Sequence, residues 1–212
     1  LRLHVDLDLE ELLGWTGAAT RLGGLATVGG RPSRRLVGDD QIVSNLQAPT
    51  ALRPYEVWLE QTLGALSLRA GLLALDAELG LLPAAALFVH SSPGTSAALG
   101  ASGINGPAIY PATALGARAR VRLAPELRLE VAVLDGAPGL RGDPSAVALE
   151  LADGALLVAE VAFDALASPR RGPRIVLGGY GYTTRREDPG LDGADRGPIG
   201  GYLLFQQGIF HG

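Results

Sequence analysis

Residues 1–10 read LRLHVDLDLE, and large apolar side chains alternate with polar or charged ones at every position. Successive side chains of a β-strand point to opposite faces of a sheet, so this stretch predicts a strand with one hydrocarbon face and one charged face. Two environments accept such a strand. In a soluble sheet the apolar face packs on a protein core, whereas in a membrane barrel it meets lipid and the charged face lines a watery lumen.

The same two-residue period returns along the chain. It is strongest in YEVWLEQ (55–61), LSLRAGL (66–72), ARARVRL (117–123) and LRLEVAV (127–133). Weaker candidate strands are residues 16–28, 87–91, 154–163, 174–184 and 201–210. Together these stretches predict an all-β, antiparallel fold of roughly nine or ten strands, with few helices apart from a turn of helix at residues 8–13.

Composition removes several classes of function. The 22 acidic and 18 basic side chains give a net charge of −4, which argues against a protein that binds nucleic acid by neutralising phosphates. The absence of cysteine excludes thiolate metal sites and cysteine nucleophiles, and it favours export through an oxidising compartment. The chain has no methionine and no signal segment before Leu1, so we interpret it as a mature form or a fragment.

The connections between candidate strands differ in length. Residues 64–65 and 123–125 form tight links, whereas residues 91–116, 135–146 and 185–198 are long stretches of Gly, Pro and Ser composition. Short turns at one end and long loops at the other are typical of an outer-membrane barrel. A soluble β-sandwich that acts as a binding or adhesion module remains the alternative.

Charge pairing predicts the register of two hairpins. A two-residue turn at Gly64–Ala65 places Glu60 opposite Arg69, and such a pair contributes ~0.2–1 kcal/mol. In the second hairpin a two-residue turn would oppose Arg122 with Leu127 and mix the two faces. We therefore predict a three-residue turn with the cross-strand pairs Arg122–Glu126, Arg120–Arg128 and Arg118–Glu130.

Seven stretches, in this order, carry a resemblance to a known family. They are VDLDLEELLGWTGA (5–18), SNLQAPTALRPYEVWLEQTLG (44–64), LSLRAGLLALDAELG (66–80), LFVHSSPG (87–94), YPATALGARARVR (110–122), VAVLDGAPG (131–139) and GGYLLFQQGIF (200–210). Their order and spacing resemble the carbohydrate-selective porins (OprB family) of Gram-negative outer membranes.

The resemblance implies a sixteen-stranded barrel that lets sugars diffuse passively across the bacterial outer membrane. The chain departs from such porins in being only about half to two-thirds as long, and in having few aromatic residues (two Trp, five Tyr and four Phe). We expect residues 1–212 to form a single barrel domain that is truncated, because an open sheet edge in lipid leaves backbone groups unpaired.

A sugar presents hydroxyl groups and apolar C–H faces, so a selective pore needs charged groups and an aromatic plane that bind it weakly. We predict that Trp58 is a stacking surface, that Glu56 and Glu60 accept hydroxyl hydrogen bonds, and that Arg69 is their partner. The arginines at 118, 120 and 122 predict a strip of positive potential. The full set of predicted pore-lining residues is Glu56, Trp58, Glu60, Arg69, Arg118, Arg120, Arg122, Arg128, Glu130, Glu160 and Arg174.

Simpler alternatives stand beside these roles. Glu60 and Arg69 can form an ordinary ion pair without touching a sugar, and Trp58 can pack beneath an infolded loop. The arginines can belong to the solvated face of a soluble sheet.

A glycoside-acting enzyme is disfavoured, because the Cα atoms of Glu56 and Glu60 on one strand lie ~13 Å apart at ~3.3 Å per residue. Paired catalytic carboxyl groups of glycosidases are ~5 Å or ~6.5–9.5 Å apart. The three histidines lack ligand spacing, so we expect no metal and no cofactor. The expected partners are saccharides in transit and outer-membrane lipid, with no nucleic acid; whether the protein is a monomer or a homo-oligomer stays open.

Overall fold

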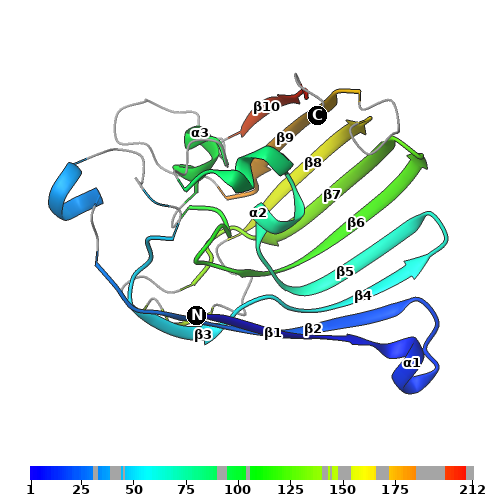
Figure 1. The fold of residues 1–212 in the computed structure, drawn as a ribbon, viewed down its shortest axis with the longest axis horizontal. Coiled ribbons are helices and arrows are strands. Elements are labelled where there is room, and N and C mark those ends of the chain that lie inside the picture. Colours follow the sequence, from blue (N-terminus) through cyan, green and yellow to red (C-terminus); the bar gives the residue numbers. More distant parts are fainter. Residues whose placement is uncertain are drawn as a thin grey trace.

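Ten strands lie side by side in one antiparallel sheet that curves into an open trough (Figure 1). The computed structural model describes residues 1–30, 33–38, 44, 46–89, 95–103, 106–139, 143, 145–147, 154–165, 172–184 and 199–208. The strands are β1 (Arg2–Asp8), β2 (Ala18–Thr27), β3 (Ala51–Pro54), β4 (Val57–Leu63), β5 (Leu66–Leu73), β6 (Ala114–Ala124), β7 (Leu127–Asp135), β8 (Ala155–Asp164), β9 (Arg174–Tyr182) and β10 (Ile199–Gln206).

The strand order is β1-β2-β4-β5-β6-β7-β8-β9-β10, and β3 pairs with β2 beside the start of β4. Short helices join some of the strands. They are α1 (Leu9–Leu13), the π-helix η1 (Ser33–Val37), α2 (Leu75–Glu78), the 3₁₀-helix η2 (Pro83–Leu87) and α3 (Ala97–Gly100). Helix α1 is capped by the Asp8 side chain, which accepts hydrogen bonds from the backbone N–H groups of Glu10 and Glu11.

The predicted all-β fold, the helical turn after Asp8 and most strand positions are confirmed. Two differences concern short segments. The strand β3 was not predicted, because four residues between Thr50 and Tyr55 are too few to establish a period. The strand predicted at residues 87–91 is wrong within the described part: Leu87 ends η2, and Phe88 and Val89 lie outside any strand. Positions 90–91, and positions 209–210 of the last predicted strand, lie outside the described residues.

The two ends of the sheet differ, as the loop lengths predicted. Helix α1 and the tight β4–β5 and β6–β7 turns lie at one end, on the right of Figure 1. At the other end the chain leaves β5 and returns to β6 through residues 74–113, here called the β5–β6 loop. Within the described part of this loop, α2 and α3 lie over the concave face of the sheet (Figure 1). The sequence predicts the long connection from residue 91, where the Gly-rich composition starts. In the structure the connection starts earlier, because β5 ends at Leu73 and α2 follows it.

The convex face of the sheet is apolar and uncovered. Along β8, outward Leu157, Val161 and Phe163 are 48%, 42% and 41% exposed, while alternate residues are buried on the concave side. The same outward exposure occurs at Leu68, Val131, Val133, Leu177, Leu203 and Phe205. Within the described ranges no second sheet packs on this face. A soluble β-sandwich requires such a layer, so the arrangement fits lipid and disfavours the sandwich.

One hairpin register is confirmed and the other is wrong. Glu60 lies opposite Arg69 across the β4–β5 turn, as predicted. Across β6 and β7, the observed pairs are Arg122–Arg128, Arg120–Glu130 and Arg118–Ala132. The turn has only two residues, 125 and 126. A β-bulge between Arg122 and Ala124 adds one unpaired residue to β6, so the charged side chains of the two strands still lie on the same face. The polar face is therefore preserved, but the pairing is shifted by two residues.

A hydrophobic core joins the β5–β6 loop to the concave face near the long-loop end. Leu75, Leu79 and Leu99 of the loop pack with side chains of the sheet that include Trp58 and Leu134. Burying one such side chain contributes about 1.5–3 kcal/mol. This cluster fixes the loop inside the trough, and it leaves the turn end of the concave face to charged residues.

The exposed apolar face yields a first prediction. Val131 lies mid-strand on the convex face of β7, and we expect Val131→Arg to lower the unfolding free energy in phospholipid vesicles by about 2–4 kcal/mol. The matched control is Leu63→Arg, beside the β4–β5 turn, where a charge near the interface should cost about 0–1 kcal/mol. Equal costs at the two depths, measured by denaturant titration, would contradict a lipid-facing surface.

Candidate functional site

The sheet register gathers most of the predicted pore-lining residues on the concave face. Glu60, Arg69 and Arg118 lie in one cross-strand row on β4, β5 and β6. Closer to the turn end, a second row joins Arg120 on β6 to Glu130 on β7 and Glu160 on β8. Each row thus contains both acids and arginines, with Arg69 opposite Arg118 in the first and Glu130 opposite Glu160 in the second.

The first row is completed by a residue that the sequence did not indicate, Glu78 at the end of α2. Its carboxylate accepts hydrogen bonds from Arg69 Nη1 and from Arg118 Nε, the latter at 3.0 Å. Glu60 Oε2 accepts from Arg69 Nε and Arg118 Nη2, both at 2.7 Å. The side chains of Arg118 and Glu78 are 0% and 3% exposed. Two carboxylates and two guanidinium groups therefore form a closed, largely buried ring, here called the Glu78 ring.

The second row forms another chain of ion pairs. Glu130 is fully buried and accepts from Arg120 Nε at 2.7 Å and from Arg128 Nε at 2.8 Å. Arg174 pairs with Asp164, a carboxylate that the sequence analysis did not single out, and Arg128 Nη1 lies 3.8 Å from Asp164 Oδ2. Arg118 and Arg120 are thus paired with carboxylates, whereas Arg122, at the end of the predicted positive strip, has no ion-pair partner among the described residues.

Polar contacts also hold the loop against the far strands. Glu160 on β8 accepts hydrogen bonds from the Gly80 N–H at 2.8 Å and from the Tyr202 hydroxyl at 3.0 Å. Farther along, Arg174 Nε donates to the Leu81 carbonyl at 2.8 Å, and the Ala84 N–H donates to the Gln206 side chain at 3.1 Å.

From Glu78 to Ala84 the loop therefore crosses the sheet from β5 and β6 to β10, tied by a polar side chain at β5, β6, β8, β9 and β10.

Trp58 takes the second of its two predicted arrangements, packed beneath the loop. It is 8% exposed and belongs to the hydrophobic core. The guanidinium carbon of Arg69 lies 3.7 Å from the ring centroid and that of Arg21 lies 5.3 Å away. These contacts are cation–π interactions, so sugar stacking on this ring would require Arg69 to move.

Glu56 lies apart from Glu60, just before β4. It is 2% exposed, has a φ of 54°, and pairs with Arg2 and Arg21. Arg21 also holds Asp6 through two hydrogen bonds of 2.6 and 2.8 Å. The structure therefore places Glu56 in an ion cluster of β1 and β2, and the predicted triad with Trp58 and Glu60 is not a shared surface.

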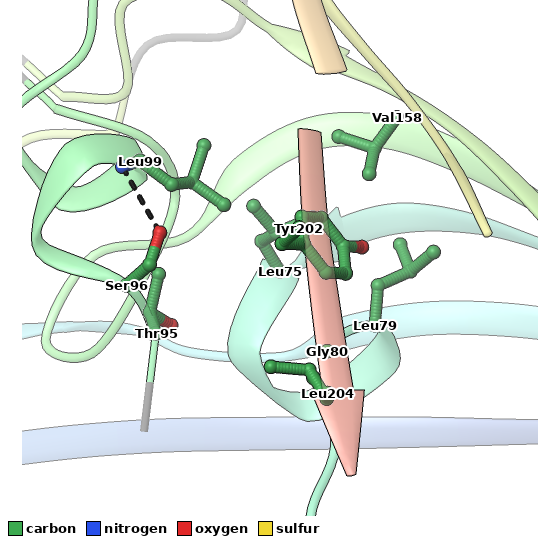
Figure 2. Close-up of a pocket in the computed structure, with 9 residues that line it drawn as sticks. All are labelled: Leu75, Leu79, Gly80, Thr95, Ser96, Leu99, Val158, Tyr202 and Leu204. Atoms are coloured by element: carbon green, nitrogen blue, oxygen red, sulfur yellow. Dashed lines mark hydrogen bonds between the residues drawn. The ribbon is translucent and has the colours of Figure 1, made fainter. Parts of the chain in front are cut away.

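Among the residues that the structure describes, two hollows on the concave face differ in character. Figure 2 shows an apolar pocket between α2, α3 and β10, where Tyr202 lies among Leu75, Leu79 and Leu204. Its volume of about 30 Å³ holds about one water molecule, too little for a sugar ring. A groove of about 440 Å³ lies at the turn end. Among its lining residues are Leu81, Pro83, Arg120, Arg122, Glu126, Leu127, Arg128, Asp164 and Arg174.

Within the described ranges, no three His, Cys, Asp or Glu side chains are grouped so that they could hold a metal ion. In the same part of the chain, every helix is too short or too polar to cross a membrane.

Comparison with known proteins agrees with the geometry. A family model described as carbohydrate-selective porin, OprB family, matches residues 1–207. A search among curated proteins gave no match. Among solved structures, the chain is similar to one from Pseudomonas putida titled "High pH structure of Pseudomonas putida OprB", with 19% sequence identity and a TM-score of 0.74. The alignment covers 88% of this chain and 46% of that chain, so this chain spans about half the length of the protein it matches.

The fold likeness identifies the open sheet as part of an antiparallel barrel. Its edges, β1 and β10, are the strands at which such a barrel would continue. The predicted family resemblance and fold class are both confirmed.

The Glu78 ring yields a second prediction. Glu78→Gln removes a charge that Arg118 needs in a dry environment, so we expect it to lower the unfolding free energy by about 2–4 kcal/mol and to expose the β5–β6 loop to protease. Glu11→Gln, on the exposed helix α1, is the matched control and should change stability by less than about 0.5 kcal/mol. If both variants resisted protease equally, the Glu78 ring would not be what holds the loop in place.

A third prediction concerns Asp76, in the loop. Burial raises the pKa of Asp76, although a hydrogen bond from the Tyr110 N–H at 3.1 Å opposes the shift. Because the folded state then binds the proton more tightly than the unfolded state, this group destabilises the fold as pH rises through its raised pKa. We expect Asp76→Asn to be more stable than the wild type, with an advantage that grows with pH. An advantage that is constant from pH 4 to pH 8 in denaturant titrations would contradict this assignment.

Proposed function

The chain belongs to the OprB family of carbohydrate-selective porins, and from that premise we propose that it forms one wall of a water-filled channel through which carbohydrates diffuse passively across the bacterial outer membrane. The two-faced sheet carries this proposal. Its convex face exposes Leu, Val and Phe side chains, and its concave face holds ionised residues and an infolded loop. A barrel in lipid needs that distribution.

The accessible members of the ionic rows are the proposed sugar contacts. The side chains of Arg120, Arg128, Glu60 and Arg69 are 36%, 21%, 20% and 17% exposed. Arg122 is also exposed, but it lies beyond the paired residues and is not one of these contacts. The buried residues of the predicted set, apart from Glu56, support these contacts from behind; they are Trp58, Arg118, Glu130, Glu160 and Arg174.

Paired charges suit a neutral polyhydroxyl solute. Each guanidinium offers several N–H donors and each carboxylate offers acceptors, so a sugar can exchange its water hydrogen bonds for protein ones. Because Glu60, Arg69, Arg120 and Arg128 each lie beside an opposite charge, this part of the wall has a small net field and does not hold a small ion strongly. Binding therefore stays weak enough for conduction.

The β5–β6 loop narrows the passage in this proposal. It lies within the trough, and hydrogen bonds between its residues 78–84 and the strands hold this segment at a fixed distance from the sheet. A rigid loop defines a constant cross-section, which a selective pore requires and a mobile lid would not provide.

The fourth prediction tests the function directly. We expect the whole protein, reconstituted in planar bilayers, to give steady channels whose ion current falls when glucose or maltose is added, because a sugar in the lumen displaces conducting water. A sugar-sized solute that lacks ring hydroxyls, triethylene glycol, is the control and should reduce the current less at equal concentration. Channels indifferent to every sugar would leave a general pore, and the absence of channels would overturn transport altogether.

A further inference from the structure

Two arginines face each other directly at the turn end of the concave face. Arg122 on β6 and Arg128 on β7 are cross-strand partners, next to the β-bulge. Like charges in this position destabilise a sheet by about 0.2–1 kcal/mol. An anion between them would reverse the sign of that contribution.

The neighbouring charges show which arginine is available. Arg128 shares Glu130 with Arg120, and Arg174 pairs with Asp164. Glu160 Oε1 lies 3.9 Å from Arg128 Nη2. Arg122 has no ion-pair partner within the described residues, and its side chain is exposed. The remaining carboxylate on the groove is Glu126, in the β6–β7 turn.

The groove beside Arg122 has the dimensions of a ligand site. Its volume of about 440 Å³ lies within the ~300–1,000 Å³ typical of small-molecule pockets. Four arginines line it, together with Leu81 and Pro83 of the β5–β6 loop. A small inorganic anion would leave the apolar wall in contact with water, whereas a sugar ring has C–H faces that can cover it.

We propose that this groove binds the anionic group of a charged carbohydrate, a sugar phosphate or a sugar acid. The anion pairs with Arg122 and Arg128, and the ring lies against Leu81 and Pro83. Planar guanidinium groups match phosphate and carboxylate oxygens through paired N–H donors. The inference extends the proposed function, on which it rests, from neutral to acidic carbohydrates.

The position of the groove assigns it a place along the channel. Short turns of outer-membrane barrels face the periplasm, so the groove lies at the inner mouth of the lumen. A solute leaving the channel meets it last. Occupancy must be brief, and the exposure of Arg122 to water keeps the interaction weak.

The fifth prediction uses glucose 6-phosphate as the probe in planar bilayers of the whole protein, with glucose and inorganic phosphate as comparison solutes. We expect glucose 6-phosphate to block the wild-type current at lower concentration than either. Arg122→Gln should raise its half-blocking concentration about three- to tenfold and leave that of glucose unchanged. Arg122→Lys should retain most of the affinity, and Glu126→Gln should strengthen the block, because it removes the competing carboxylate.

The remaining outcomes separate this inference from the proposed function. If glucose still blocks but Arg122→Gln leaves the glucose 6-phosphate block unchanged, the groove assignment fails and the sugar channel stands. If inorganic phosphate blocks as well as glucose 6-phosphate, the site holds a free anion and the carbohydrate part fails. If no sugar of any charge blocks, the proposed function itself fails. Formation of stable open channels by the variants in plain salt verifies that the barrel is intact.

Discussion

Buried charge on the concave face is the constraint on which the rest of the structure depends. Arg118 has a fully buried side chain, and a guanidinium group out of water is stable only with its donors paired. Glu60 supplies one carboxylate from the neighbouring strand, but the second comes from Glu78, which lies on α2. The buried guanidinium of Arg118 therefore has both of its carboxylate partners only when the β5–β6 loop is folded into the trough.

The loop and the sheet consequently stabilise each other. Leu75, Leu79 and Leu99 remove apolar surface from water at the long-loop end, where the concave face is itself apolar. Toward the turn end, hydrogen bonds hold the loop instead, because the side chains of Glu160 and Arg174 bind the loop backbone. This division leaves one face of the ionic rows accessible between the loop and the turns, and it places the groove there.

The same pairing explains why an arginine-rich wall need not be a strongly positive one. Alternation in β6 places three arginines on one face, yet Glu78, Glu60 and Glu130 neutralise the inner two. Net charge remains at the end of the column, beside the bulge. In the proposed channel, neutral and acidic sugars would meet different parts of one wall.

The sequence by itself determined the two faces of the sheet, the tight turn at Gly64–Ala65 and the pairing of Glu60 with Arg69, because the strand period and short turns are local properties. Only the tertiary structure decided the β6–β7 register. The bulge shifts the cross-strand pairs by two residues but leaves the charged side chains on the same face, so the alternation in the sequence does not reveal it. It alone also decided the partners of Arg118 and the burial of Trp58. Those depend on Glu78 and on a loop whose path across the strands is fixed by long-range packing, which no periodicity encodes.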